Sequence, residues 1–542
     1  MDSNPMNVFK GSDSLAQYLD PDHNPLLPLV EIPDSLNPLR ADGVRIFAKM
    51  LTALPAHNVK SLPALQMLRS KPQAQHQTIV EASSGSTVLS LGIMSRALWG
   101  HDDVHAYVTN KKHPDSLRLL KFFGLKTVLY GGLAQQEPSD ENGVMARLRR
   151  LAASDERVCY PGQYDSDENW KAHERWTGAQ IWKQLPEVNV FCATIGTGGC
   201  ITGTGTYLKA MKPSVKTIGV CNIQGDPVPG PRHLSGFHTS PFPWRETIDI
   251  FENVAAVDAF RASMQLSRHG LISGPSSGQA LCGLVAHLQA AKAEGRLGEY
   301  ADAVTGEVNA VFVCADLPYQ YMDLYFKNIP REEFPPTFNE NLLSCDLDPY
   351  DERLFLSAHD ASKLAGGAVP CTAPSSCNCD LRQRQQAPPS PPASTSSAGG
   401  SPPGPRPSTS LPTPPGFRTL ALDGHDLLQE PAIIVDIRPR ESYVRSHVRG
   451  AWNVPLAVPP TDFFGDAKVV EQRWWEMRGA IDGPLWPGPD EMQERQVLVL
   501  CGNGELGRMG VAMLRARGVE AFSVEGGYDA LLCRGCRGMG RD

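Results

Sequence analysis

The stretch VNVFCATIGTGGCITGTG, residues 188–205, decides the fold that we expect for the first half of this 542-residue chain. Its apolar run Val188–Ile195 predicts a buried strand, and the glycine-rich turn 196–199 follows directly. Residues 205–211 predict a helix. A glycine-rich turn between the end of a strand and a helix lets backbone N–H groups approach a phosphate. The stretch therefore predicts a phosphate-binding loop in an α/β domain.

Three further motifs lie on either side of this stretch, and each supplies a different chemical group. Lys60 lies in AHNVKSLPALQML (56–68), and its amine could form a Schiff base with an aldehyde cofactor. EASSGST (81–87) offers hydroxyl and N–H groups suited to a carboxylate. LISGPSSG (271–278) adds a second Ser-Ser-Gly. In this order the motifs predict a cofactor site spread over one domain.

Together these motifs resemble the fold-type II pyridoxal-phosphate enzymes, and within them cysteine synthase and cystathionine β-synthase. NPLLPLVEIPDSL (24–36) is similar to the opening segment of that family, and HLSGFHTS (233–240) is similar to its H-x-I-x-G-I-G stretch. Gln163 and Tyr164 resemble its Gln-Tyr pair. The resemblance covers roughly residues 20–330 and rests on several motifs in the right order, which is far more specific than any one of them.

The resemblance implies a role for each candidate site residue. Lys60 would be the lysine that binds the cofactor and acts in catalysis. The other residues expected to hold pyridoxal 5'-phosphate are Ser86, Gly196, Thr197, Gly198, Gly199, Cys200 and Ser276. The residues expected to bind the amino-acid substrate are Ser83, Ser84, Gly85, Thr87 and Gln163.

The expected chemistry follows from Ser276, which matches the serine that meets the pyridine nitrogen in the family. A hydroxyl cannot hold that nitrogen protonated as a carboxylate would, which implies a moderate electron sink suited to β-elimination and β-replacement. The chain departs from the family pattern at Ser61-Leu62, at Ser86 and at Cys200. We interpret His57 as a packing or polar-network residue and Cys200 as a buried, unreactive thiol.

The C-terminal part of the chain predicts a separate α/β domain. AIIVDIR (432–438) and VLVLCGNGELGR (497–508) each contain an apolar run typical of a buried parallel strand. VEAFSVEGGYDAL (519–531) predicts a strand, a Gly-Gly turn and the start of a helix. Cys501 follows its strand directly and begins a glycine-rich loop, where backbone N–H groups could stabilise a thiolate or persulfide.

These C-terminal motifs resemble the rhodanese domain. The shared features are Asp436-Ile437-Arg438, the run SHVRGAWNVP (446–455), Cys501 as the matching catalytic cysteine, and Glu525-Gly526-Gly527. The usual loop places arginine five residues after the cysteine, whereas Leu506 occupies that position here and the arginine is Arg508. The resemblance implies that Cys501 carries sulfur as a persulfide, with a purely binding or regulatory module as the alternative.

Composition limits the domain organisation and the partners. We expect a pyridoxal-phosphate domain at 1–355, a tail and Pro/Ser/Gly-rich linker at 356–416, and a rhodanese-like domain at 417–542, with EEFPPTF and LDPYDERLF packing on the first domain. The net charge of −8 argues against a nucleic-acid partner. The sequence contains no run of eighteen apolar residues, so we predict no membrane span. We expect a cytoplasmic protein, since no targeting signal is evident. The resemblance implies a homodimer.

The thirteen cysteines are scattered and odd in number, which suits reduced thiols rather than a disulfide framework. Two groups stand out: Cys371, Cys377 and Cys379 before the linker, and Cys533 with Cys536 near the C-terminal end. Neither group has the paired spacing of a zinc site, so we interpret them as mobile tail thiols and predict no metal.

Three functions remain open from the sequence. The first is β-replacement that forms cysteine or a related thio-amino acid from an O-activated serine and a sulfur donor, with Cys501 supplying the sulfur. The second is a lyase that removes sulfur from cysteine and passes it to Cys501. The third is a sensor or scaffold that binds without turnover, which the residues at positions 61, 62 and 86 keep open.

Overall fold

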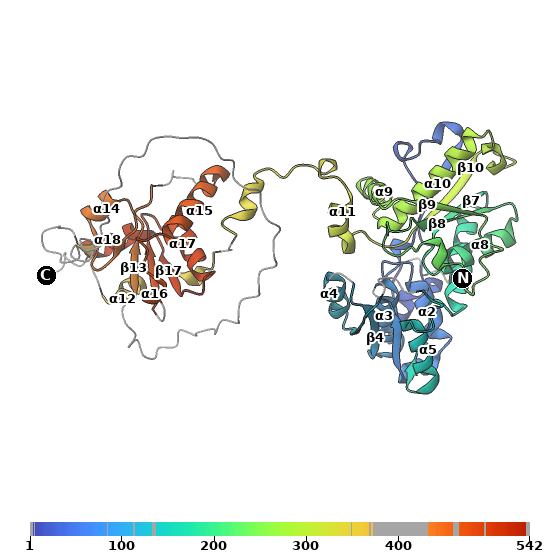
Figure 1. The fold of residues 1–542 in the computed structure, drawn as a ribbon, viewed down its shortest axis with the longest axis horizontal. Helices are drawn as coiled ribbons and strands as arrows, with labels where there is room; N and C mark the ends of the chain where they lie inside the picture. Colours follow the sequence, from blue (N-terminus) through green and yellow to red (C-terminus); the bar gives the residue numbers. More distant parts are fainter. Residues whose placement is uncertain are drawn as a thin grey trace. The chain divides into compact units, whose positions relative to one another are not determined.

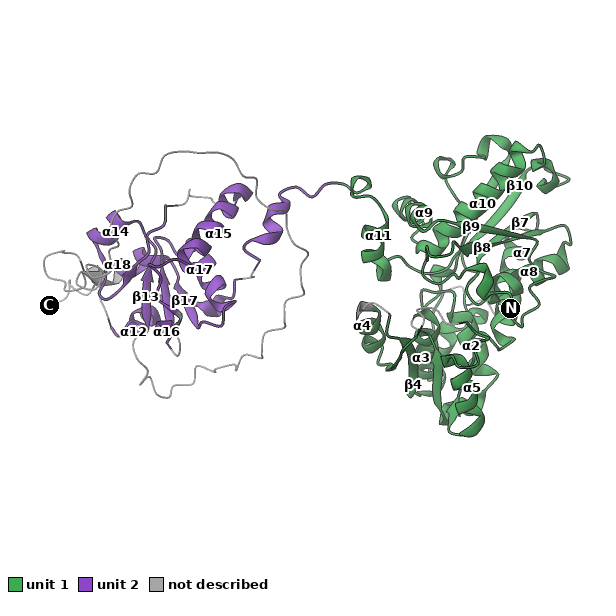
Figure 2. Ribbon diagram, viewed as in Figure 1, with its two compact units in different colours: residues 1–335 green, residues 336–542 purple. Residues whose placement is uncertain are grey.

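The computed structural model describes residues 4, 6–83, 85–111, 114–132, 137–347, 350–367, 370–371, 432–458, 465–492 and 495–537. The chain divides into two compact units, residues 1–335 and 336–542 (Figure 2). The Pro/Ser/Gly-rich part of the expected linker lies outside the described residues, as do Cys377 and Cys379 and the side chains of Cys371, Cys533 and Cys536. Residues 356–367 and 370–371, which we expected in the tail before this linker, belong to unit 2.

Unit 1 consists of two α/β lobes, as the resemblance implies. The larger lobe is built on a six-stranded sheet whose first strand is antiparallel to the second and whose other strands are parallel. In spatial order these strands are β1 (Leu29–Glu31), β2 (Val44–Met50), β10 (Val308–Cys314), β7 (Val190–Thr194), β8 (Lys216–Asn222) and β9 (Ile250–Val254). Every residue of β10 is buried, as expected for a parallel strand with helices on both faces.

Helices cover both faces of this sheet (Figure 1). Side chains on one face of the sheet form a core with α9 (Ala256–Arg268) and α10 (Pro275–Ala293). Side chains on the opposite face pack with α2 (Ser61–Arg69) and α8 (Gly199–Met211). Alternate residues of each strand thus contribute to different cores, because successive side chains of a strand point to opposite faces.

The smaller lobe holds a four-stranded parallel sheet. Its strands, in spatial order, are β5 (Lys126–Tyr130), β4 (Val104–Thr109), β3 (Thr78–Ala82) and β6 (Val158–Cys159). The helices of this lobe are α3 (Ser86–Trp99), α4 (Pro114–Phe122) and α5 (Val144–Ser154). The shorter helices of unit 1 are α1 (Ser14–Leu19), α6 (Glu168–Ala172), α7 (Ala179–Gln184) and α11 (Met322–Asn328), with a π-helical turn His173–Gly178 between α6 and α7.

The stretch 188–205 forms the predicted strand, loop and helix, but the helix begins earlier than predicted. β7 ends at Thr194, and α8 starts at Gly199 rather than at Gly205. The reason is packing: a Cβ atom on Gly203 would lie 1.8 Å from the backbone oxygen of Trp170. Glycine inside α8 therefore permits close helix contact, and does not mark a continuation of the loop.

Unit 2 is a small α/β domain with a five-stranded parallel sheet, as predicted. Its strands, in spatial order, are β11 (Phe355–Leu356), β17 (Ala521–Val524), β16 (Val497–Leu500), β13 (Ile433–Asp436) and β15 (Trp452–Asn453). A separate antiparallel pair joins β12 (Pro370–Cys371) to β14 (His447–Val448). One face of the sheet packs with α15 (Ala467–Ile481) and α17 (Glu505–Arg515), and the other with α12 (Ala358–Leu364), α14 (Arg440–Arg445) and α18 (Gly527–Arg537). A further short helix is α16 (Pro489–Met492).

The segment after residue 335 differs from the expectation that it packs on the first domain. Glu333 does remain with unit 1, where it pairs with Arg261 at 2.8 Å. Cys345, however, is buried in the core of unit 2, and Phe355 pairs with Ser523 of β17. The compact units therefore divide before residue 355, because LDPYDERLF contributes an edge strand to the C-terminal sheet.

Two observations concern membranes and metal ions. Within the described part of the chain, every helix is too short or too polar to span a lipid bilayer. In the same residues, no three His, Cys, Asp or Glu side chains gather in a way that could hold a metal ion.

Candidate active site

Lys60 lies at the start of α2, and the backbone before it is held on two sides. The Val59 N–H donates to the oxygen of Ala315 at 2.7 Å, which joins this loop to the segment after β10. The Asn58 side chain accepts from the Lys60 N–H at 2.9 Å and from the Ser90 hydroxyl at 3.0 Å. Because these contacts fix the loop, the direction of the Lys60 side chain is set by both lobes of unit 1.

The amine of Lys60 reaches the glycine-rich loop. Its Nζ atom lies 3.5 Å from Oγ1 of Thr197, which also accepts from Nδ2 of Asn169 at 3.0 Å. Burial lowers the pKa of Lys60, while the nearby Cys200 and Asp316 raise it. Lys60 is therefore closer to a neutral, nucleophilic amine than an exposed lysine would be.

The glycine-rich loop is shaped so that only glycine fits at its central positions. Gly198 has φ +86°, and a Cβ atom there would lie 2.3 Å from the Phe237 ring. On Gly199, a Cβ atom would lie 2.1 Å from Oδ1 of Asn169. The loop leads straight into α8, whose first-turn N–H groups have no acceptor within the helix. This arrangement fits a phosphate.

Cys200 is in the first turn of α8, next to Lys60. Burial raises the pKa of the Cys200 thiol to about 12, and Lys60 and Thr204 oppose that shift. The thiol is therefore neutral at physiological pH and donates hydrogen bonds only weakly. This supports the interpretation of Cys200 as unreactive.

Buried polar atoms around Lys60 indicate room for a polar ligand. Oδ1 of Asn169, Nε2 of His173 and Oδ1 of Asp316 are buried, and none has a hydrogen-bond partner among the described residues. Burial and the charge of Lys60 lower the pKa of His173 to about 3, so its ring is neutral. Since buried polar groups normally have partners, these two acceptor oxygens and the ring nitrogen fit a cofactor that brings polar substituents of its own.

The predicted substrate loop connects β3 to α3. Helix α3 starts at Ser86, and its preceding residue, Gly85, supplies no side-chain cap. The free N–H groups of the first turn therefore face the loop and suit a carboxylate. Ser83 accepts from the Gly85 N–H at 3.3 Å. Ser84 lies outside the described residues.

Gln163 is joined to this loop through two hydrogen bonds. The hydroxyl of Thr87 donates to Oε1 of Gln163 at 2.6 Å, and Nε2 of Gln163 donates to the oxygen of Ala82 at 3.1 Å. The hydroxyl proton of Thr87 is thus engaged, while Nε2 of Gln163 keeps a second N–H for a ligand.

Glu81 positions Gln163, a role that was not predicted from the sequence. Its carboxylate accepts from the backbone N–H groups of Gly162 at 3.0 Å and Gln163 at 3.3 Å. Burial raises the pKa of Glu81 to about 7, against the lowering effect of these hydrogen bonds. The sequence did contain one signal of this role. Glu81 is an acidic residue within the apolar strand β3, and a buried charge needs hydrogen-bond partners.

Ser276 is in the first turn of α10, and 6% of it is exposed. The start of this helix is tied to the segment after β10, because the Gly274 N–H donates to the oxygen of Asp316 at 2.7 Å. The structure thus links Ser276 to Lys60 through residues 315 and 316. Asn58, Asn169, His173 and Asp316 were all missed from the sequence. Asn58 lies two residues before Lys60, and only tertiary contacts bring the other three to Lys60.

Cys501 in unit 2 occupies the predicted nest of N–H groups. Its Sγ atom accepts from the N–H groups of Gly504 and Gly507, both at 3.2 Å. Only 4% of the residue is exposed, and burial raises the pKa of Cys501 while these hydrogen bonds lower it. Gly504, with φ +94°, lets the loop turn into α17. The loop therefore suits an anionic sulfur that accepts backbone hydrogen bonds.

Other residues of the rhodanese-like motifs make side-chain contacts that stabilise the fold of unit 2. Arg438 pairs with the buried Asp436 at 2.6 Å and lies over the Tyr528 ring, 3.2 Å from its centroid. Arg508, the displaced arginine of the loop, lies over the Phe355 ring at 4.7 Å. The guanidinium of Arg508 thus packs on β11.

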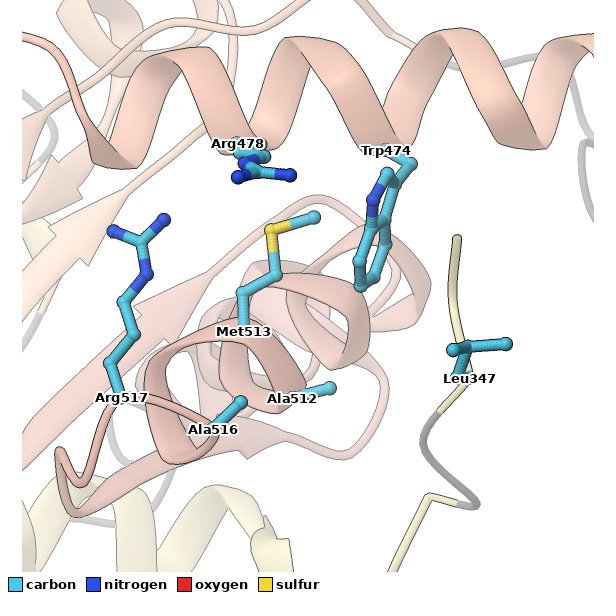
Figure 3. Close-up of a pocket in the computed structure, with 7 residues that line it drawn as sticks. All are labelled: Leu347, Trp474, Arg478, Ala512, Met513, Ala516 and Arg517. Atoms are coloured by element: carbon cyan, nitrogen blue, oxygen red, sulfur yellow. The ribbon is translucent and has the colours of Figure 1, made fainter. Parts of the chain in front are cut away.

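A pocket of about 400 Å³ lies between α15 and the end of α17 (Figure 3). Trp474 and Arg478 line it from one helix, and Met513 and Arg517 from the other side. None of its lining residues belongs to the loop that follows Cys501. This pocket is therefore separate from the thiol.

Comparison with known proteins agrees with the two units. The family model for "Pyridoxal-phosphate dependent enzyme" matches residues 24–305, and that for "Rhodanese-like domain" matches residues 421–532. The chain is 32% identical to cysteine synthase of Aquifex aeolicus (strain VF5), over 51% of this chain and 84% of that protein. It is 29% identical to a probable cysteine synthase of Bacillus subtilis (strain 168), over 45% of this chain and 82% of that protein.

A solved structure is also similar to part of this chain. The crystal structure of cysteine synthase from Entamoeba histolytica has 20% sequence identity and a TM-score of 0.49, over 60% of this chain and 93% of that one. The matched family model covers more than half of the sequence, residues 24–305 of 542. The chain therefore belongs to the family of pyridoxal-phosphate dependent enzymes, and it carries a rhodanese-like domain in its C-terminal part.

Proposed function

We propose that this enzyme performs β-replacement, forming cysteine or a related thio-amino acid from an O-activated serine and a sulfur donor. The observation that carries the proposal is the position of the Lys60 amine, 3.5 Å from Thr197 of the glycine-rich loop. A cysteine synthase and a probable cysteine synthase match this chain over most of their own length. The amine, the loop and the free end of α3 provide the three groups that such a reaction needs.

The residues around Lys60 would hold pyridoxal 5'-phosphate as follows. The loop 196–200 and the first turn of α8 would bind the phosphate, Lys60 would bond to the aldehyde carbon, and Ser276 would lie at the ring nitrogen. When bound, the cofactor supplies the electron sink for negative charge that develops at the Cα atom of the amino acid. Its visible absorbance also gives a direct measure of binding.

The protein groups perform the proton transfer and the orientation of the substrate. Lys60 removes the Cα proton, because burial keeps its amine close to the neutral form that can accept one. The first turn of α3, with Nε2 of Gln163, binds the substrate carboxylate and so places the Cα–H bond. Glu81 fixes Gln163 by accepting its backbone N–H.

Cys501 is proposed to carry sulfur as a persulfide. Its thiolate would attack the outer sulfur of a persulfide donor, breaking the S–S bond of the donor and forming one on Cys501, with the donor thiolate leaving. A dithiol, or two small thiols, then reduces Cys501–S–S⁻, which releases sulfide, regenerates the Cys501 thiol and leaves the reductant oxidised to a disulfide. Two N–H groups at 3.2 Å stabilise the anionic sulfur of Cys501 during this cycle.

Product analysis tests the proposal and separates it from the lyase. Full-length protein loaded with pyridoxal phosphate is incubated with O-acetylserine and sulfide, and then separately with cysteine alone. We expect cysteine from the first mixture. Pyruvate and ammonia from cysteine, without synthesis in the first mixture, would replace β-replacement by the lyase reaction. A lack of turnover in both mixtures would favour a role in binding without catalysis.

The sulfur-carrier role has its own test in the full chain. The Cys501→Ser variant is compared with wild type using sulfide, and then using glutathione persulfide with dithiothreitol. Because a carrier tethered to the enzyme raises the local sulfur concentration, we expect a loss of about tenfold with the persulfide only. Cys282→Ser, at a half-buried thiol of unit 1, is the control. Equal rates for Cys501→Ser and wild type with both donors would remove the carrier role.

We also propose that the enzyme is a homodimer, as its resemblance to the family implies. Light scattering during size-exclusion chromatography would give a mass near twice 59.0 kDa. A mass of one chain at micromolar concentration would exclude a stable dimer.

A further inference from the structure

Asn169 of α6 is a fully buried residue whose side chain contacts the glycine-rich loop. Its exposed fraction is 0%, so solvent does not compete for its hydrogen bonds. Its Nδ2 atom donates to the backbone oxygen of Gln163 at 2.6 Å and to Oγ1 of Thr197 at 3.0 Å. The amide of Asn169 thus joins a residue of the loop to a residue of the segment before α6.

The orientation of this amide is fixed by its surroundings. A backbone oxygen can only accept a hydrogen bond, so the nitrogen of the Asn169 side chain, and not its oxygen, faces Gln163. The Oδ1 atom lies against Gly199, since a Cβ atom on Gly199 would lie 2.1 Å from it. Both N–H groups of the amide are used, and the second of them points at the Thr197 hydroxyl. Asn169 therefore acts on Thr197 as a donor.

The hydroxyl oxygen of Thr197 is surrounded by donors. It accepts from Asn169 at 3.0 Å and from the Gly199 N–H at 3.3 Å, and Nζ of Lys60 lies 3.5 Å away. A hydroxyl oxygen has two lone pairs, and the two shorter hydrogen bonds occupy both. The O–H group of Thr197 must then point away from these donors, and in the described part of the chain each of its hydrogen bonds is one that it accepts.

We propose that Asn169 is a positioning residue that directs the hydroxyl proton of Thr197 toward the cofactor phosphate. This inference rests on the proposed binding of that phosphate by the loop 196–200. A phosphate oxygen accepts a strong hydrogen bond from a hydroxyl, because the acceptor is charged. Asn169 acts through Thr197: its N–H group occupies a lone pair of the hydroxyl oxygen, so the O–H group is what Thr197 presents to the phosphate.

Two substitutions at position 169 should act differently for this reason. Alanine removes the donor and leaves the Thr197 hydroxyl free to rotate. Aspartate keeps the shape of asparagine but presents a carboxylate oxygen where Asn169 presents an N–H group. In Asn169→Asp the Thr197 hydroxyl would therefore donate to residue 169 and turn away from the phosphate.

The test measures how much the phosphate contributes to cofactor binding. Pyridoxal 5'-phosphate and pyridoxal differ in the phosphate group, so the Kd of pyridoxal divided by the Kd of pyridoxal 5'-phosphate isolates that contribution. Absorbance titration of cofactor-free, full-length protein gives both values. We expect this ratio to fall about fivefold in Asn169→Ala and about fiftyfold in Asn169→Asp, with the Kd of pyridoxal within about twofold of wild type. Asn142→Ala, at an exposed position, should retain the wild-type ratio.

The same comparison in a Thr197→Val background shows whether the hydroxyl carries the effect. Valine keeps the shape of threonine without its hydroxyl, so Asn169→Ala should change the ratio by less than about twofold there. In that background Asn169→Asp retains only the direct repulsion between its charge and the phosphate, and its effect should be much smaller than with Thr197 present. An equal fall of the ratio in both backgrounds would overturn the proposal.

Circular dichroism establishes which variants fold. If Asn169→Ala does not fold, the comparison of Asn169→Asp in the two backgrounds decides. An unchanged ratio in the folded variants with Thr197 present would also overturn the proposal.

This readout is independent of the reaction that the enzyme catalyses, because no amino acid is present during the titrations. A selective fall of the ratio supports the role of Asn169 even if no amino acid is turned over. A wild-type ratio near one would mean that the loop does not bind the phosphate, and would remove this inference together with the proposed phosphate site. Cysteine formation by Asn169 variants with an unchanged ratio would leave the proposed function intact and remove Asn169 from it.

Discussion

The amine of Lys60 and the hydroxyl of Thr197 lie 3.5 Å apart, although 137 positions separate them in the sequence. Lys60 directly precedes α2, and Thr197 lies in the loop between β7 and α8. Asn169 donates to the same Thr197 oxygen from a third segment. Three distant parts of unit 1 thus meet at one hydroxyl group, and the predictions about unit 1 concern what they do there.

Replacement of Lys60 should abolish catalysis and change the bound cofactor. In Lys60→Ala, we expect the visible absorbance band of bound pyridoxal phosphate to be lost or shifted, because the amine that bonds to its aldehyde is absent. Cysteine formation should fall by about a thousandfold or more, as expected for loss of a general base. Lys292→Ala, at an exposed ion pair with Asp42, is the control. Retention of both band and rate in Lys60→Ala would exclude this role.

Thr87 should act on substrate binding through Gln163. Thr87→Val keeps the shape of the side chain but removes the donor to Oε1 of Gln163. We expect KM for O-acetylserine to rise about tenfold, the effect of one lost hydrogen bond, with kcat changed much less. Steady-state kinetics give both values, with Thr305→Val at an exposed position as control. A fall in kcat alone would place Thr87 in the chemical step instead.

Glu81 should make unit 1 less stable as the pH rises through neutrality. The pKa of Glu81 is raised from 4.5 in the unfolded chain to about 7 in the fold, so the folded state binds this proton more tightly. The stabilising contribution is fully present below 4.5 and is lost as the pH rises through about 7. Its size is at most about 3 kcal/mol.

Glu81→Gln should therefore reduce the pH dependence of unfolding in this window. Denaturant unfolding at about pH 5 and about pH 8, followed by hydrogen exchange of peptides from unit 1, gives the two free energies for each variant. The difference between them should be smaller in Glu81→Gln than in wild type. Glu156→Gln, at an exposed site, should match wild type. Identical pH dependence in Glu81→Gln and wild type would show that Glu81 is already ionised at low pH.

Arg508 should support the fold of unit 2 rather than the reactivity of its thiol. The guanidinium lies over Phe355, so Arg508→Ala should lower the stability of unit 2 by about 0.5–1 kcal/mol. The rate at which iodoacetamide alkylates Cys501 should stay within about twofold of wild type, because backbone N–H groups supply its hydrogen bonds. A large fall in that rate would show that the positive charge acts on the thiol.

The local features of the site could be predicted from the sequence. The apolar run before Gly196 specifies β7, and the run before Cys501 specifies β16, because burial between two helical layers needs a continuous apolar strand. The order of Lys60, the hydroxyl-rich loop and the glycine-rich loop identified the family and its cofactor. These signals are local, since each depends on residues that are neighbours along the chain.

Only the tertiary structure decided which side chains support these motifs. Glu81, Asn169 and Asp316 are ordinary polar residues in the sequence, and they become important because the tertiary fold places them, buried, beside Gln163, Thr197 and Gly274. The same holds for Phe355, whose short apolar segment could pack on either unit. Its pairing with β17 depends on a free sheet edge, and no pattern within the segment itself reveals where that edge lies.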